Sequence, residues 1–139
     1  MLALLAQREG VPLSSEIIAG SVNTNPALIR RLLSMLANAG LTASQLGAGG
    51  GALLAREPHA ITLLDVYRAV DDAQLFAMHR EEPNPACMVG RHIQQTLRGV
   101  IDDAQRAMEA SLATRTLADV VDDMARSERK LERARTRRA

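Results

Sequence analysis

Apolar residues recur at intervals of three and four along most of the chain, a pattern that predicts helices separated by short breaks. We expect helices over residues 2–7, 15–22 and 26–39, with glycine stops after the first and third. Ser14 or Ser15 suits the N-cap of the second helix. Its expected inward-facing residues are Ile17, Ile18, Ala19 and Val22.

The break at residues 23–26 is dense in turn-forming residues. Pro26 fits the first position of a helix, and Thr24 or Asn25 can cap it. Arg30 and Arg31 fall on or beside the exposed face of this helix. Two short helices joined in this way form a helix-turn-helix, whose second helix can read base edges in the major groove. An ordinary helical hairpin has the same spacing, so the spacing alone does not separate the two.

The segment after the third helix predicts a β-hairpin. Residues 41–45 and 52–55 read as strands, and the glycine-rich residues 47–51 as the turn between them. A phosphate-binding loop is disfavoured, because no Lys-Ser/Thr pair follows the glycines and no helix begins on them. A hairpin whose tip approaches a DNA backbone needs small residues, so the order of elements favours a winged helix-turn-helix.

A further helix begins near Thr62, where Asp65 completes a pattern that resembles a capping box. A long helix is expected from about Val89 to Leu112, and a short last helix is expected from its cap at Thr116 to Met124. The long helix carries an apolar row that we expect to pair with a second subunit, consisting of Ile93, Leu97, Val100, Ile101, Ala104 and Met108. A monomeric helical bundle is the alternative.

These elements predict a mainly α protein with a small β-hairpin. The expected parts are a winged helix-turn-helix over residues 1–72, a linker with the long dimerisation helix and the short final helix over 73–125, and a basic, flexible tail over 126–139. The composition agrees, since the chain is 47% apolar with only one Tyr and one Phe, so aliphatic side chains must fill the core.

The net charge of +1 hides an uneven distribution. Residues 1–56 carry a net charge of +2, residues 57–125 of −6 and residues 126–139 of +5. The middle therefore repels phosphate, whereas the two ends attract it. The tail reads as a solvated, frayed helix, with an extra contact to the DNA backbone as the sharper alternative.

Several function classes are disfavoured. The single cysteine excludes an intrachain disulfide, and no apolar run reaches the roughly 18 residues of a membrane span. We therefore expect a soluble, cytoplasmic protein. Neighbouring aspartates at 102–103 and 122–123 point to different sides of a helix, and His59, His79 and His92 lack metal-binding spacing. We accordingly expect neither an enzyme nor a metal site.

Four segments together resemble the Rrf-two family of bacterial winged-helix regulators, the relatives of IscR and NsrR. They are SSEIIAGSVNTNPALIRRLLSMLANAGL, GAGGGALLAR, ITLLDVYRAV and PNPAC before the long helix. The resemblance, over roughly residues 2–124, implies a homodimeric transcription regulator, usually a repressor, that binds a palindromic operator. Carried over by position, the DNA-facing residues it implies are Ser14, Ser15, Thr24, Asn25, Pro26, Leu28, Arg30 and Arg31, with Gln45, Gly49, Gly50 and Gly51 on the wing.

The chain departs from the family at the cluster site. Iron–sulfur members hold their cluster with three cysteines near the start of the long helix, whereas this chain has Cys87 alone. We therefore expect no cluster and no cofactor, because one thiolate cannot hold a cluster without further ligands such as His79 or His92. Cys87 itself is either a buried small residue or a thiol sensor that biases the dimer geometry.

The sequence thus predicts a sequence-specific DNA-binding transcription regulator, a homodimeric repressor whose partners are double-stranded DNA and a second copy of itself, with no membrane. Two alternatives stay open, namely a protein-interaction module with a degenerate DNA site and a redox sensor that uses Cys87.

Overall fold

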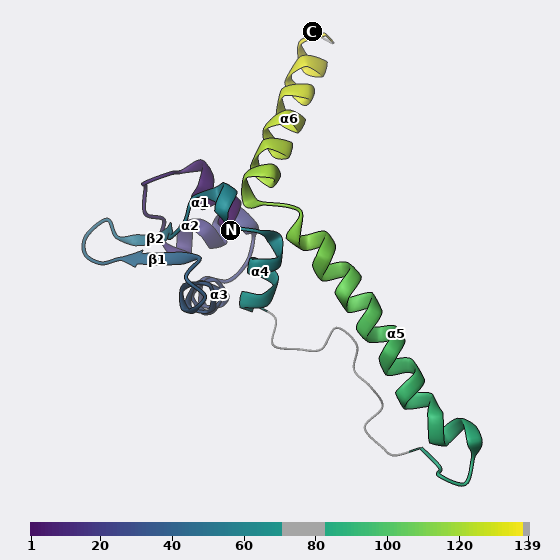
Figure 1. Cartoon of the computed structure of the whole chain (residues 1–139). Helices are drawn as coiled ribbons and strands as arrows, with labels where there is room; N and C mark the ends of the chain where they lie inside the picture. The colour runs from purple at the N-terminus through teal and green to yellow at the C-terminus, as the bar shows by residue number, and fades with distance from the viewer. Residues whose placement is uncertain (71–82, 138–139) are drawn as a thin grey trace.

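The computed structural model describes residues 1–70 and 83–137, which form a mainly helical fold with one two-stranded sheet (Figure 1). The expected fold class is confirmed. The elements in chain order are α1 (Leu2–Gln7), α2 (Ser15–Val22), α3 (Pro26–Asn38), β1 (Thr42–Gln45), β2 (Gly51–Leu54), the 3-10 helix η1 (Pro58–Ala60), α4 (Leu63–Val70), α5 (Met88–Ala113) and α6 (Leu117–Thr136). The boundary expected at residues 72–73 and His79 lie outside the described residues.

The N-terminal elements share one apolar core, and the first turn of α6 completes it. Its most deeply buried large side chains come from α2, α3 and the segments that flank β1 and η1, and they are Ile18, Ile29, Leu36, Leu41 and Ile61. Leu117 joins this core from α6, which packs against α1 and η1. The burial of these aliphatic side chains holds the N-terminal elements together.

The structure places the helix-turn-helix where the sequence predicts it. Ser14 caps α2 by accepting a hydrogen bond from the amide of Ile17. Asn23 ends α2 in the left-handed conformation, with φ of 52°. The inward face expected for α2 is partly wrong, because Ile17 and Val22 are exposed and only Ile18 and Ala19 are buried. This short helix packs on α3 along a narrow face, so its outer residues reach solvent.

The hairpin is also confirmed, and it has a third partner. β1 pairs antiparallel with β2, with Thr42 opposite Leu54 and Gln45 opposite Gly51. Leu13 extends this sheet through two backbone hydrogen bonds with Ala52, at 3.0 and 2.8 Å. Thr42 ties β1 to α3 by donating its hydroxyl to the carbonyl of Leu33. The base of the wing is therefore fixed to the core, while its turn projects into solvent (Figure 1).

Beyond α4, the chain forms two long helices that leave the N-terminal part in different directions (Figure 1). α5 has nearly the expected bounds. The last helix is longer than the predicted short one, because α6 continues past Met124 to Thr136, through most of the tail that was expected to be a frayed, flexible helix. Its extension is rich in Arg, Glu, Lys and Ala, which have high helix propensity, although it packs on little else. No helix among the described residues is long and apolar enough to cross a membrane.

Candidate nucleic-acid interface

Helix α3 divides into a buried face and a polar, exposed face. Ile29 and Leu36 point into the core. Arg30 and Arg31 lie on the opposite side with Ser34 and Asn38, which follow them at helical spacings of three, four and seven and are also exposed. The sequence analysis missed Ser34 and Asn38, although their spacing from the two arginines is the signal that identifies them.

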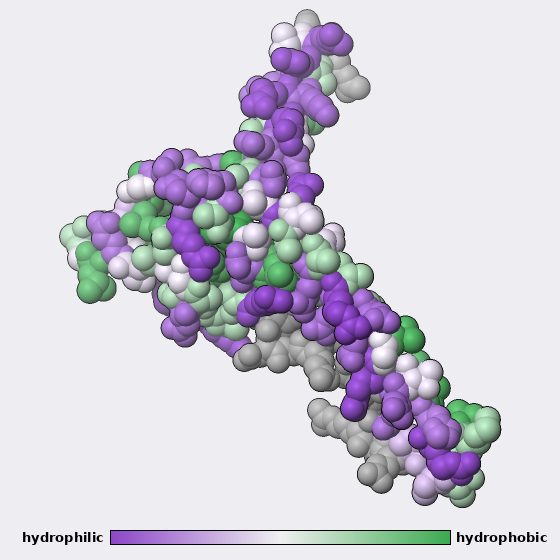
Figure 2. Space-filling model, viewed as in Figure 1, coloured by the Kyte–Doolittle hydropathy of each residue, from purple (hydrophilic) through white to green (hydrophobic). Residues whose placement is uncertain are grey.

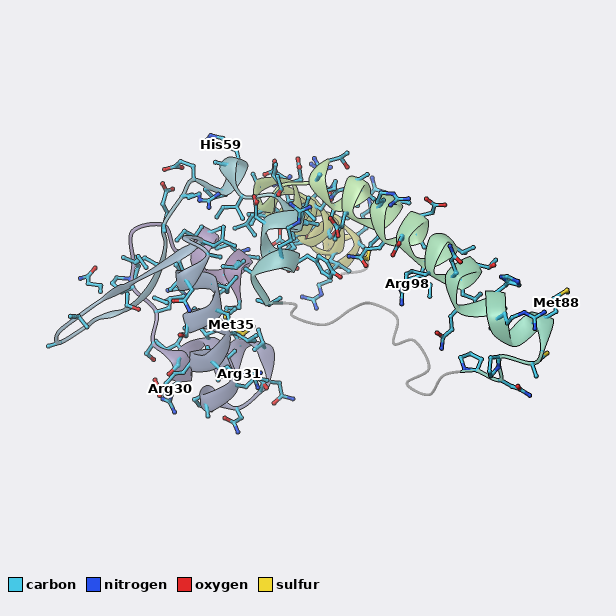
Figure 3. All side chains as sticks on the ribbon, turned by 60° about the horizontal axis from the view of Figure 1, so that its bottom comes forward. Arg30, Arg31, Met35, His59, Met88 and Arg98 are labelled. Carbon is cyan, nitrogen blue, oxygen red and sulfur yellow. The ribbon has the colours of Figure 1, made fainter. Side chains whose placement is uncertain are left out.

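The two arginines differ in their surroundings. Arg30 Nη1 lies 3.0 Å from Glu16 Oε1 and 3.2 Å from Ser15 Oγ, so it links α3 to the start of α2. Among the residues that the structure describes, Arg31 forms no hydrogen bond or ion pair. Figure 3 shows both arginines on the outer side of α3. Arg31 is therefore the cation of this face that is ready to meet a phosphate, whereas the charge of Arg30 is partly balanced.

Glu16 adds a negative charge beside this face. Its own backbone amide and the hydroxyls of Ser14 and Ser15 donate to it and, with the nearby Arg30, hold the pKa of the carboxyl below its usual value. Glu16 therefore stays ionised at neutral pH. The side chains of Arg30 and Glu16 are 61% and 63% exposed, so solvent screens their ion pair and its energy is small.

The turn residues mainly organise the start of α3. The carboxamide oxygen of Asn25 accepts from the amides of Ala27, at 2.6 Å, and Leu28, at 3.4 Å. Pro26 occupies the first turn of the helix, as expected. Thr24 and Leu28 are exposed beside them. The cap uses only the carboxamide oxygen of this exposed residue, so its amide group is left as a donor and Asn25 can stabilise α3 and contact a ligand at the same time.

The glycines of the wing have distinct roles. Gly49 has a φ of +81° and open space around it. A Cβ on Gly50 would lie 2.2 Å from the carbonyl oxygen of Gln45, and one on Gly51 would lie 2.5 Å from the backbone of Leu13. Gly50 and Gly51 are therefore required by the fold itself, whatever else the wing contacts.

The wing tip carries an apolar residue that the sequence analysis did not single out. Leu46 follows the exposed Gln45 and is 92% exposed. The hairpin projects beside α3 (Figure 1), so α3 and the wing form one continuous surface. A polar helix flanked by a hairpin has the shape that enters a major groove while the hairpin follows the adjacent backbone.

Cys87 lies far from this surface, at the N-cap of α5. Figure 3 places its neighbour Met88 at the end of α5 remote from Arg30 and Arg31. Of the two alternatives for Cys87, the buried small residue is wrong, because the side chain is exposed. Hydrogen bonds from the backbone amides of Gly90 and Val89 lower the pKa of the thiol.

The residues present do not fit an iron–sulfur cluster. Such clusters are held mainly by cysteine thiolates, and the chain has one cysteine. Residues 1–70 and 83–137 contain no group of three or more His, Cys, Asp or Glu side chains placed to hold a metal ion.

The apolar row of α5 is largely open to solvent. Ile93, Leu97, Val100 and Ala104 are exposed, whereas Ile101 and Met108 are half-buried. Met88 and Val89 extend the row at the N-terminal end of the helix and were not among the predicted residues. Figure 2 shows hydrophobic side chains along the outer side of α5, between hydrophilic ones. The surface of a monomer normally carries scattered single apolar residues, whereas a continuous apolar row of this length is typical of an interaction surface.

Comparisons with known proteins agree with this geometry. A family model described as Rrf2, iron-dependent transcriptional regulator, matches residues 1–123. YwnA of Bacillus subtilis strain 168, provisionally named an HTH-type transcriptional regulator, is 46% identical over 125 residues, which are 89% of this chain and 91% of YwnA.

Two solved structures are also similar. One, described provisionally as a DNA-binding protein, has 43% identity and a TM-score of 0.68, with coverage of 86% of this chain and 90% of that chain. The other, IscR of T. potens, has 28% identity and a TM-score of 0.66, with coverage of 88% and 79%.

Proposed function

Because the chain belongs to the Rrf2 family of DNA-binding transcription regulators, we propose that it is a sequence-specific homodimeric repressor of a palindromic operator. The observation that carries the proposal is the exposed polar face of α3, with Arg31 at its centre and the wing beside it. Side chains on this face donate to base edges, and the arginines neutralise phosphates.

The second part of the proposal is the dimer. The apolar row from Val89 to Ala104 would be buried if two α5 helices packed against each other, which would remove its contact with water. A twofold axis between them would present two α3 helices in opposite orientations. Such a pair reads two inverted half-sites, which is why a palindromic operator follows from the dimer.

The proposed mechanism has no step through iron, although the description of the family includes iron dependence. Purification under anaerobic conditions, followed by measurement of iron and acid-labile sulfide, tests this directly. We expect substoichiometric amounts of both, and one cluster per subunit or per dimer would contradict the expectation.

Titration of DNA from the region upstream of the protein's own gene tests the main proposal. Wild-type protein is titrated into this duplex and into a scrambled duplex of the same length and composition, each at two salt concentrations. A steep salt dependence with tighter binding to the natural sequence supports a regulator. Absence of binding to either duplex would instead favour the alternative, a protein-interaction module with a degenerate DNA site.

A thiol-responsive regulator is the second candidate function, favoured by the exposure of Cys87 and the lowered pKa of its thiol. A thiolate at a helix N-terminus reacts readily with oxidants, and its modification would alter the end of the proposed dimer helix. The test compares operator binding by wild type and Cys87→Ser, each with and without a thiol oxidant. Oxidant-insensitive binding by the wild type, together with slow alkylation of the native protein, would rule out this function.

A further inference from the structure

The C-terminal half of α6 projects from the molecule as a free arm. Only the first turns of α6 pack against α1 and η1, where Leu117 is buried. All residues from Arg126 to Arg137, here called the arm, are exposed. Figure 1 shows that α6 leaves the N-terminal part on the side opposite α3. The arm therefore presents a surface that the proposed operator contact does not use.

Most of the basic residues of the arm lie on one side of the helix. With 3.6 residues per turn, four basic residues lie within about 100° of arc. We call them the basic stripe, and they are Arg129, Lys130, Arg133 and Arg137. Glu128 and Arg135 lie on the opposite side, whereas Glu132 lies about 60° from Arg129, at the edge of the stripe. Within residues 83–137, Arg126 is paired with Asp123, but the members of the basic stripe form no ion pair.

This arrangement only partly serves the stability of the helix, because Arg133 in the last turn interacts favourably with the helix dipole, whereas neighbouring basic residues of the stripe repel each other. Arg129 and Arg133 are four residues apart, as are Arg133 and Arg137, and each such like-charge pair destabilises a helix slightly. Glutamates placed three or four residues from basic groups offset such repulsion, and within the stripe only Arg129 has such a neighbour, Glu132. A polyanion lying along the stripe would relieve this repulsion.

We propose that the basic stripe binds the phosphate backbone of double-stranded DNA, at a stretch different from that bound by α3 of the same subunit. Arg129 to Arg137 span about 12 Å of helix, along which a duplex carries about seven phosphate charges. The stripe consists only of arginines and one lysine, whose charges can neutralise the phosphates of any sequence, so we expect its binding to depend little on sequence. The inference rests on DNA binding by the chain, and not on repression or a palindromic site.

A bridging experiment tests the proposal. A short duplex from the upstream region is immobilised and loaded with full-length protein, and capture of a fluorescent scrambled duplex is then measured. The test variant replaces Arg129, Lys130, Arg133 and Arg137 with Gln. One control is Arg135→Gln, on the opposite side of the arm. A second control changes Arg129, Arg133 and Arg137 to Lys, which keeps the charge. Circular dichroism checks that the helix persists.

We expect the four-Gln variant to capture at least about tenfold less scrambled duplex than the wild type, with both controls near wild type. The salt slope of its binding to scrambled DNA should fall by about 3–4, close to one for each phosphate that the stripe no longer neutralises. Its affinity for the short upstream duplex should change less than about twofold. Because a dimer could also bridge two duplexes through its two α3 helices, the conclusion depends on the difference between variant and wild type.

Three outcomes would overturn the inference. They are equal capture by variant and wild type, a parallel loss of affinity for the short duplex, and stripe-dependent binding to phosphatidylglycerol vesicles in place of the scrambled duplex. The preference of the four-Gln variant for upstream over scrambled DNA reports separately on the proposed regulator function. Absence of that preference in the wild type would refute the regulator without bearing on the arm.

Discussion

Thr62 and Thr116 lie opposite each other in an antiparallel backbone bridge, and each caps the helix that follows it. The amide of Leu63 donates to the carbonyl of Arg115, and the amide of Leu117 donates to the carbonyl of Ile61, both at 2.8 Å. Both segments read Thr-Leu-x-Asp-Val. This paired junction joins the start of α6 to the N-terminal core, and so fixes where α5 and α6 leave it.

The caps at this junction predict a dependence of stability on pH. The Thr62 amide and hydroxyl donate to Asp65 and hold the pKa of its carboxyl below the usual value of 3.8, and Thr116 does the same for Asp119. As the pH falls, these carboxyls are therefore protonated in the unfolded state before they are protonated in the folded state. The stabilisation by the two caps is fully present above about pH 4, and it is lost as the pH falls through the lower pKa of the folded state. Urea titrations should show wild type more stable than Asp65→Asn at neutral pH, and the difference should shrink near pH 3. A constant difference would contradict the assignment.

Local patterns explain why much of the fold is predictable from sequence. Asn25 and Pro26 fix the start of α3 through contacts within three residues, and the alternation around the glycines locates the hairpin. Long-range contacts are not visible in this way. The bridge from Thr62 to Thr116 and the approach of Gly51 to Leu13 join segments far apart in the chain. The exposure of Cys87 likewise depends on tertiary packing that no local pattern states.

The candidate site was predictable to a similar degree. Helical spacing identified the exposed side of α3 through Arg30 and Arg31. It could not show that Glu16, on another helix, partly balances Arg30. The extension of α6 was expected only as a frayed helix in a flexible tail, because its charged sequence lacks the apolar periodicity on which helix prediction depends.

The glycines of the wing should separate into two classes. Gly51→Ala would push a methyl group into the backbone of Leu13, so we expect a loss of about 3 kcal/mol or more in stability. Gly49→Ala has open space and only the strain of a positive φ, which costs about 1–2 kcal/mol. Thermal unfolding of both variants, together with measurement of their DNA affinity, tests this separation. Equal stabilities would refute the structural role of Gly51.

A charge in the apolar row of α5 should abolish the proposed dimer. Val100 is 62% exposed in the single chain and would be buried in a helix pair, where an added carboxylate would be desolvated without a partner. We expect Val100→Glu to be a folded monomer in sedimentation equilibrium at concentrations where wild type is dimeric. Gln95→Glu, on the opposite side of α5, should stay dimeric. A dimeric Val100→Glu protein would place the interface elsewhere.

Removal of Arg31 should weaken DNA binding without affecting the fold. Arg31 is exposed, and it forms no ion pair within the described part of the chain, so in the proposed complex its replacement would remove one phosphate contact and no contact within the protein. We expect Arg31→Ala to lower operator affinity by about tenfold at physiological salt and to reduce the salt slope by about one. Its urea midpoint should match wild type. Unchanged affinity would count against α3 as the DNA-contacting helix.

Removal of the Glu16 carboxylate should strengthen DNA binding, in contrast to removal of Arg31. This prediction distinguishes phosphate binding by α3 from a model in which any substitution on this surface weakens binding. The Glu16 carboxylate holds Arg30 at 3.0 Å and would repel an approaching phosphate. Glu16→Gln removes that repulsion and frees Arg30, so affinity should rise by about two- to fivefold, in keeping with the small energy of an exposed ion pair. The salt slope should become steeper by up to about one, because Arg30 then adds a phosphate contact.

Glu128→Gln makes the same change in net charge on the arm, away from α3, and should leave affinity for a short duplex unchanged. An equal gain in both variants would mean that overall charge, and not the pair at α3, controls binding.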